Sequence, residues 1–150
     1  MGTGNVLSEM ERLDEAEKYY LQAVQLYEKL GDTIGIADCQ LALGKLYYKK
    51  QKYDSAREAY QKALSGHQKA GDQEKVAKDL LYVSNVLQAL KQGEAAIQMI
   101  ELSLQIHIEQ KLPGVKSVTK KLLRMRNITG NKNAKAFLQE LTDRWVNRQD

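Results

Sequence analysis

With 150 residues, the chain has room for one compact domain or for one short array of repeats. No apolar run approaches the length of about 18–20 residues that a membrane-spanning helix needs, and a single cysteine excludes an internal disulfide, so secretion and membrane insertion are disfavoured and a cytoplasmic location is expected. The charge is uneven, because residues 1–110 carry 13 basic and 16 acidic side chains whereas residues 111–150 carry 10 and 3.

The sequence repeats itself at a spacing of forty residues. Gly31-Asp32 recurs as Gly71-Asp72, and Ala16 recurs as Ala56 and Ala96. Self-similarity at a fixed spacing of this size is typical of stacked repeat proteins. The resulting segments are unit one (1–32), unit two (33–72), unit three (73–112) and a basic, degenerate segment (113–150).

Unit one begins within a repeat. If Gly4 corresponds to Gly44, its first helix lacks about two turns and is followed by a second helix that begins near Asp14 and ends before Gly31. This truncation leaves an apolar face on the second helix and on part of the first helix of unit two. We expect that face to be covered by preceding repeats or by a second copy, which makes the chain a candidate homo-oligomer.

Unit two predicts two helices. An apolar stripe from Ile36 to Tyr47 indicates the first helix, and a polar run follows it. The second helix is predicted to start near Asp54, a residue of N-cap type, and to end at Gly71, because glycine adopts the left-handed conformation found after helix C-termini. Asp72 is then expected to cap the next helix, so each Gly-Asp pair marks a stop followed by a start.

Small residues recur where the two helices of one unit must pack. Ala16, Ala56 and Ala96 are predicted to lie where the second helix presses against the first, because small side chains allow the backbones to approach closely. Tyr20 and Tyr60 follow one turn later and are expected to fill the neighbouring core.

The C-terminal segment predicts a fourth, degenerate helix pair over 114–126 and 133–147. Its polar and basic character suits a capping unit, which covers the last repeat on one side and faces water on the other. Phe137 and Trp145 are expected to fill the last groove. Eight basic and no acidic residues lie from Lys111 to Gln139, so weak nucleic-acid binding is a rival hypothesis. The cluster of Lys120, Lys121, Arg124 and Arg126 within this stretch lacks the aromatic groups that usually accompany specific readout.

The pattern Leu43-Gly44-x-x-Tyr47, followed by Ala56-x-x-x-Tyr60, resembles the tetratricopeptide repeat (TPR). Gln40 occupies the family's tryptophan position, and the period of 40 rather than 34 residues is similar to the long repeats of Pins-type adaptors and bacterial arrays. The resemblance implies an all-α, right-handed solenoid of stacked antiparallel helix pairs, with about three units and a degenerate capping pair. It also implies a non-catalytic scaffold or adaptor.

In this family the first helix of each pair lines a concave groove that binds a peptide or helix of a partner. Lysines there favour a carboxylate, so we expect an acidic protein or peptide partner rather than nucleic acid or membrane. A chaperone-type carboxylate clamp is not predicted, because unit three lacks the required basic pair. The alternative is a segment of a larger scaffold whose main role is self-association. By register, the candidate groove residues are Asn5, Ser8, Lys45, Tyr48, Lys49, Lys78, Tyr82, Asn85, Gln88 and Lys121.

The sequence contains no recognisable catalytic or metal-binding constellation. His67 and His107 share a repeat position, and stacking would separate them by about 10 Å, too far to share a zinc ion. Cys39 is expected to be an ordinary packed thiol, and no phosphate-binding loop is present. We therefore predict a protein that is not an enzyme and needs no cofactor or metal.

Overall fold

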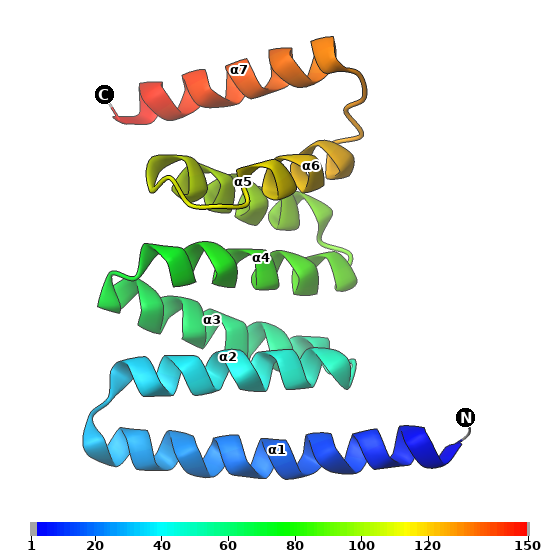
Figure 1. The fold of residues 1–150 in the computed structure, drawn as a ribbon, viewed down its shortest axis with the longest axis vertical. Helices are drawn as coiled ribbons and strands as arrows, with labels where there is room; N and C mark the ends of the chain where they lie inside the picture. Colours follow the sequence, from blue (N-terminus) through cyan, green and yellow to red (C-terminus); the bar gives the residue numbers. More distant parts are fainter. Residues whose placement is uncertain (1–2, 150) are drawn as a thin grey trace.

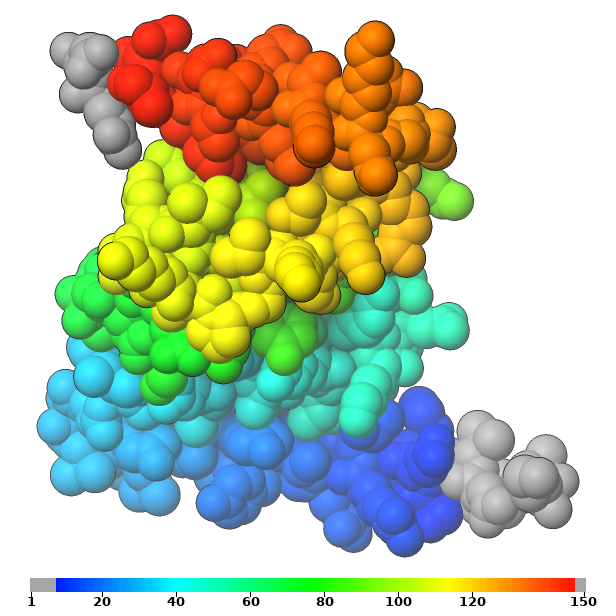
Figure 2. All heavy atoms as spheres, turned by 45° about the horizontal axis from the view of Figure 1, so that its top comes forward, coloured from blue at the N-terminus to red at the C-terminus, as the bar shows by residue number. Residues whose placement is uncertain are grey.

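Seven α-helices follow one another in a single stack, and residues 3–149, which the computed structural model describes, contain no strand. The helices are α1 (Thr3–Leu30), α2 (Thr33–Lys49), α3 (Tyr53–Ala70), α4 (Gln73–Ala89), α5 (Gly93–Glu109), α6 (Val115–Met125) and α7 (Asn131–Gln149). Side chains are described from Ser8 to Asn147. In Figure 1 α1 lies at the bottom and α7 at the top, and in Figure 2 the colours form bands in sequence order. The predicted all-α solenoid is therefore confirmed.

The Gly-Asp pairs end one helix and start the next, as the sequence predicts. Gly71 follows α3 with a φ of 74°, and the backbone N–H of Asp72 donates to the carbonyl of His67 at 3.2 Å. The Asp72 side chain then accepts from the N–H of Lys75 at 3.1 Å and caps α4. The equivalent pair between α1 and α2 has the same arrangement.

The start of α3 differs from the prediction. The N-cap position is Lys52, whose side chain makes no capping hydrogen bond, and Asp54 lies in the first turn instead. There the Asp54 carboxylate pairs with Arg57 at 3.4 Å and lies near the positive end of the helix dipole. The preceding turn holds Gln51 at a φ of 61°, and Lys91 repeats this conformation forty residues later at a φ of 65°.

Unit one also differs from the prediction, because α1 is one continuous helix of 28 residues. A break before Asp14 would have placed the turn at Glu11, which corresponds to Gln51 in unit two. Instead, the helical hydrogen bonds continue through this position, at one bond for each residue added. The N-terminal turns of α1 consequently extend past the end of α2 (Figure 1).

Small residues line the seam between α2 and α3. A Cβ atom added at Gly44 would lie 2.4 Å from the ring of Tyr60, so only glycine fits there without rearrangement. Ala56 is fully buried in the same seam, as predicted. Its equivalent on α1, Ala16, is only half-buried, because no separate first helix of unit one covers it.

Three small hydrophobic cores follow one another along the stack. The first joins α1, α2 and α3, the second joins α3, α4 and α5, and the third joins α5, α6 and α7. Trp145 is buried in the third core and Phe137 packs against it, which confirms the roles predicted for these two residues in the last groove. Each core is shared by helices close in sequence, so successive cores hold the stack together.

Candidate functional site

One face of the stack carries equivalent positions of α2, α4 and α6. Lys45, Asn85 and Met125 stand forty residues apart, and each lines a hollow on this face, which we call the inner groove. On α2 the helical period places Lys45 on the side opposite to the buried Leu43. The inner groove therefore repeats along the stack because the sequence does.

The first hollow of the inner groove, the tyrosine hollow, has a volume of about 310 Å³ between α2, α3 and α4. Tyr60 and Tyr82 stack with their ring centroids 5.4 Å apart, and Lys45 Nζ lies 4.7 Å from the centroid of the Tyr82 ring. Tyr48 stays partly exposed and packs edge-on against Tyr53. Aromatic surface and hydrogen-bond donors thus meet here. The hollow is lined by Lys45, Tyr48, Lys49, Tyr60, Tyr82 and Asn85.

The second hollow, the cationic hollow, measures about 360 Å³ and lies between α4 and α6. Gln88, Lys121, Arg124 and Met125 line it. Lys121 Nζ donates to Asn85 Oδ1 at 2.5 Å, which connects the cationic hollow with the tyrosine hollow. Burial, together with the nearby charge of Arg124, lowers the pKa of Lys121.

A third hollow of about 340 Å³ continues the inner groove between α1 and α2. Lys45 and Lys49 line this hollow as well as the tyrosine hollow, so the two are contiguous. Tyr20 is half-buried here, whereas its equivalent Tyr60 is buried. The difference follows from the missing first helix of unit one, which would otherwise lie over Tyr20 as α2 lies over Tyr60.

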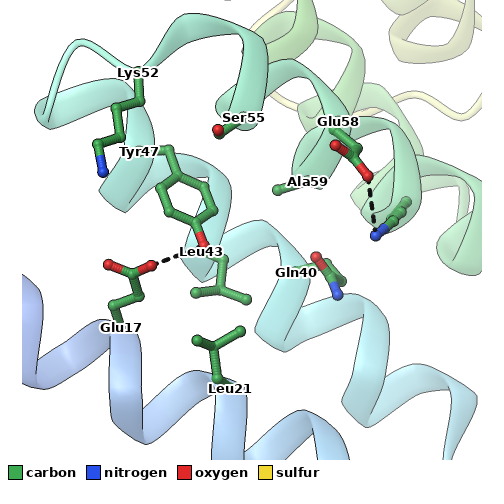
Figure 3. A pocket seen from close by; sticks show the side chains of 10 residues that line it. Glu17, Leu21, Gln40, Leu43, Tyr47, Lys52, Ser55, Glu58 and Ala59 are labelled. Atoms are coloured by element: carbon green, nitrogen blue, oxygen red, sulfur yellow. Dashed lines mark hydrogen bonds and ion pairs between the residues drawn. The ribbon is translucent and has the colours of Figure 1, made fainter.

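A further hollow, of about 310 Å³, lies on the opposite face between α1, α2 and α3 (Figure 3). Leu21 and Leu43 point toward each other within it. The hydroxyl of Tyr47 donates to Glu17 at 3.1 Å, and the nearly buried amine of Lys50 binds the same carboxylate at 2.9 Å. These hydrogen bonds outweigh desolvation and lower the pKa of Glu17. Glu17, Tyr47 and Lys50 thus bind one another, and they fix α1 on α2.

Two of the predicted groove residues, Ser8 and Lys78, do not line these hollows, and the side chain of a third, Asn5, is not described. Ser8 is exposed on the N-terminal extension of α1, because the separate first helix on which its placement depended is absent. The side chain of Asn5 lies outside the described residues. Lys78 is exposed on α4 and pairs with Glu74 at 3.6 Å. The inner groove brings together the remaining predicted residues, which are Lys45, Tyr48, Lys49, Tyr82, Asn85, Gln88 and Lys121.

His67 belongs to a buried polar cluster that links α2, α3 and α4. Its Nδ1 atom bonds to Asp79, its Nε2 atom lies 2.8 Å from Asp38, and Lys75 Nζ lies 3.2 Å from the same Asp38 carboxylate. Burial opposes the imidazolium, but the hydrogen bonds to Asp79 and Asp38 outweigh it and raise the pKa of His67. Burial also raises the pKa of Asp79, so the pair retains a proton to higher pH than a free histidine.

The two histidines lie in different surroundings. Nδ1 of His107 is 2.8 Å from the carbonyl oxygen of Ser103, whereas the ring of His67 bonds to two carboxylates. Among residues 3–149, no three His, Cys, Asp or Glu side chains are grouped so that they could hold a metal ion. Cys39 is buried as a free thiol, and burial raises its pKa.

The repeat pattern missed two groove residues. It predicts Tyr60 only as core, and the ring is indeed buried, yet one side of it also lines the tyrosine hollow. Arg124 stands at the repeat position of Gly44 and Ser84, where the degenerate unit departs from the pattern. The arginine at this small-residue position is the signal that could have identified Arg124 as a groove residue, because an arginine side chain cannot fit a close helix seam.

Stacked antiparallel helix pairs with an inner groove define a helical repeat protein. Residues 2–69 match the sequence model of a family described as the tetratricopeptide repeat. This match supports the tetratricopeptide repeat over the first part of the chain, as the motifs in unit two indicate. Such repeats generally mediate interactions between proteins and are typically non-catalytic.

A solved structure shares this fold. The crystal structure of BtubC (BKLC) from P. vanneervenii matches with a TM-score of 0.70 and 18% sequence identity, over 93% of this chain and 59% of that one. At this identity the likeness concerns the fold alone, and the chain spans 59% of the length of that protein. No curated protein matches the sequence. In the described part of the chain, no helix is long and apolar enough to cross a membrane.

Proposed function

We propose that this chain is a non-catalytic adaptor that binds a peptide or helix of a protein partner in its inner groove. The observation that carries the proposal is the tyrosine hollow, where stacked rings and a partly exposed Tyr48 stand beside lysines and an amide. Aromatic rings supply contact area at a small cost in conformational entropy, and the lysines and Asn85 supply hydrogen bonds for orientation.

Internal ion pairs weaken the rival hypothesis of nucleic-acid binding. Arg126 pairs with Glu94 at 3.4 Å and with Glu101 at 3.3 Å, and Arg144 lies 3.9 Å from Glu101. Lys121 is half-buried against Asn85. These contacts engage Lys121 and Arg126, so fewer cations of the basic stretch can bind a phosphate backbone.

A peptide-display selection tests the proposal. Peptides selected on the wild type should lose at least about tenfold in affinity when Tyr48, Tyr82 and Asn85 are all changed to alanine, because interface hot spots cost about 1–2 kcal/mol each. Their NMR shift changes should map to α2 and α4. The matched control changes Gln40, Ser55 and Glu58, which line the opposite hollow, to alanine.

Circular dichroism establishes that both triple variants fold. If the selected peptides bind the groove variant as tightly as the wild type, or if the control variant loses as much affinity, the inner groove is not the binding site.

A second candidate role is self-association through α1. Tyr19, Leu26 and Leu30 form a stripe at helical spacing and are 67%, 61% and 78% exposed. The occupant we propose is α1 of a second copy, lying antiparallel so that the same stripe is buried on both chains. Sedimentation velocity at high micromolar concentration should detect dimers of the wild type. Changing Leu26 and Leu30 to lysine should abolish these dimers, whereas changing the polar Gln25 to lysine should keep them. A monomeric wild type would contradict this role.

A further inference from the structure

The His67 cluster, which consists of His67, Asp38, Lys75 and Asp79, must hold one proton more than a neutral imidazole provides. Nδ1 of His67 bonds to a carboxylate oxygen of Asp79, and Nε2 lies 2.8 Å from Oδ1 of Asp38. An ionised carboxylate only accepts, and a neutral imidazole has a single N–H, which can serve one of the two contacts. The second contact requires either an imidazolium or a protonated carboxyl group. One extra proton therefore completes both hydrogen bonds.

The two carboxylates differ in the partners that remain to them if that proton leaves. Asp79 is fully buried, and its second oxygen has no hydrogen-bond partner within the described residues. The Asp38 side chain is 49% exposed, and Lys75 Nζ lies 3.2 Å and 3.4 Å from its two oxygens. An unpaired carboxylate costs more in a buried site than beside water and an ammonium group. The remaining ring proton should thus stay with Asp79, and the contact with Asp38 should be lost.

The charged groups that face the ring come from α2 and α4, the helices that pack against α3 at this point. They are Asp38, Asp79 and, through Asp38, Lys75. The thiol of Cys39 follows Asp38 on α2, and burial together with the charge of Asp38 raises its pKa, so the thiol stays uncharged near neutral pH. Burial opposes the imidazolium, but the hydrogen bonds to Asp79 and Asp38 outweigh it and raise the pKa of His67 above the ordinary 6.5. The proton consequently leaves as pH rises through values above 6.5.

This arrangement is not a feature of the repeat. Forty residues further along, His107 takes the place of His67, but Lys78 and Thr119 replace the two aspartates. The cluster joins α2, α3 and α4, so the proton affects the junction of units two and three and not the next junction of the stack.

We propose that the His67 cluster is a proton-operated latch between units two and three. With the extra proton, His67 holds α2 through Asp38 and α4 through Asp79. Without it, the ring keeps Asp79 and releases Asp38, which retains its ion pair with Lys75. The packing of α2 on α3 therefore loosens at this point as pH rises, while α3 stays fixed on α4.

Release of Asp38 also changes the third hollow of the inner groove, which this side chain lines together with Lys45 and Lys49. The cluster loses one positive charge and Asp38 stays ionised, so the hollow gains negative character as pH rises. The latch goes beyond the proposed function and does not rest on it, because it concerns contacts within the chain and its tests need no partner.

The tautomer of His67 tests the latch in the wild type. Long-range proton–nitrogen NMR spectra show which ring nitrogen carries a proton. Nε2 should carry one at about pH 6 and lose it by about pH 9, where the neutral ring should hold its proton on Nδ1, facing Asp79. A proton that stays on Nε2 would show that Asp38 is not released. Unchanged protonation of both nitrogens over this range would show that no extra proton leaves, and either result would overturn the inference.

Double-mutant cycles measure the same release as a change in unfolding equilibrium. The cycle of His67→Gln with Asp38→Asn should give a coupling of about tenfold in the unfolding constant at about pH 6, because the two changes remove one shared charge-assisted hydrogen bond. At about pH 9 this coupling should vanish.

The matched control is the cycle of His67→Gln with Asp79→Asn, which should keep its coupling at both pH values because that bond is retained. A coupling to Asp38 that persists at high pH, or is absent at low pH, would contradict the latch. Loss of both couplings together would mean that the whole cluster opens rather than releasing Asp38, and would likewise overturn the inference.

Discussion

At the scale of single residues, the least expected feature is the buried cluster around His67. A histidine between Asp79 and Asp38 ties three helices together, and both His67 and Asp79 are shielded from water. Lys75 is the remaining charged group that contacts the cluster, through Asp38. One oxygen of Asp79 has no hydrogen-bond partner within the described residues, so the cluster depends on its charge balance.

We predict that this cluster makes stability depend on pH above neutrality. The pKa of His67 is raised above its ordinary value of 6.5, so the stabilisation is complete below about pH 6.5 and is lost as pH rises through the folded-state pKa. Urea unfolding between pH 6 and 8 should show a falling free energy of unfolding. His67→Gln should flatten this dependence and cost on the order of 3 kcal/mol at pH 6, because it leaves a buried carboxylate unpaired.

The matched control for this prediction is His107→Gln. That ring occupies the same repeat position and is also buried, but it contacts Ser103 rather than a carboxylate. The pH dependence should therefore persist in His107→Gln, and an unchanged slope in His67→Gln would show that another group is responsible.

At the scale of the helices, the seam between α2 and α3 depends on glycine. We predict that Gly44→Ala lowers the free energy of unfolding by about 1–3 kcal/mol, because the added methyl group would lie 2.4 Å from the Tyr60 ring and must displace it. Gly93→Ala is the control, since no atom lies within 4 Å of the added Cβ there, and it should leave stability unchanged or raise it by up to about 1 kcal/mol. Thermal unfolding of both variants checks the pair, and equal stability of the two would contradict the close seam.

Helix junctions show the repeat in the backbone as well as in the sequence. Gly31, Gly71 and Lys111 stand forty residues apart, and all three have positive φ, with 52° at Lys111. Since left-handed conformation costs a non-glycine residue about 1–2 kcal/mol, Lys111→Gly should raise the free energy of unfolding by about 1 kcal/mol. Lys120→Gly, in the middle of α6, should lower it by a similar amount, about 1 kcal/mol; destabilisation by Lys111→Gly would contradict the assignment.

At the scale of the whole molecule, the stack consists of neighbour contacts, so damage at one end should stay there. We predict that Trp145→Ala, which removes a buried side chain from the third core, costs about 3–5 kcal/mol locally. Hydrogen exchange should rise in α6 and α7 while α2 and α3 keep their protection. Val146→Ala is the control, because its side chain is 59% exposed; uniform loss of protection would indicate one cooperative unit instead of a stack.

The uneven distribution of charge between residues 1–110 and 111–150 also affects the molecule as a whole. The C-terminal segment contributes Lys121 and Arg124 to the inner groove, while Arg126 is used for pairs with Glu94 and Glu101. The segment predicted as a cap thus covers the third core and supplies the cationic part of the candidate site.

By itself, the sequence determined the repeat and everything that repeats with it. Helix ends at Gly71, N-caps at Asp72, the small-residue seam at Ala56 and most of the inner groove could be read from local pattern, because each depends on the residue type and its period. The groove residues of units two and three follow from the same register.

Features that depend on contacts outside the repeat pattern were determined only by the tertiary structure. The continuity of α1 is one example, because the repeat register predicts a break near Asp14 whereas the structure continues the helix through that position. The partners of His67 and the joining of Lys121 to Asn85 come from residues 12 to 36 positions away, at contacts that no other unit repeats. A periodic pattern predicts what units share, whereas packing in three dimensions determines where they differ.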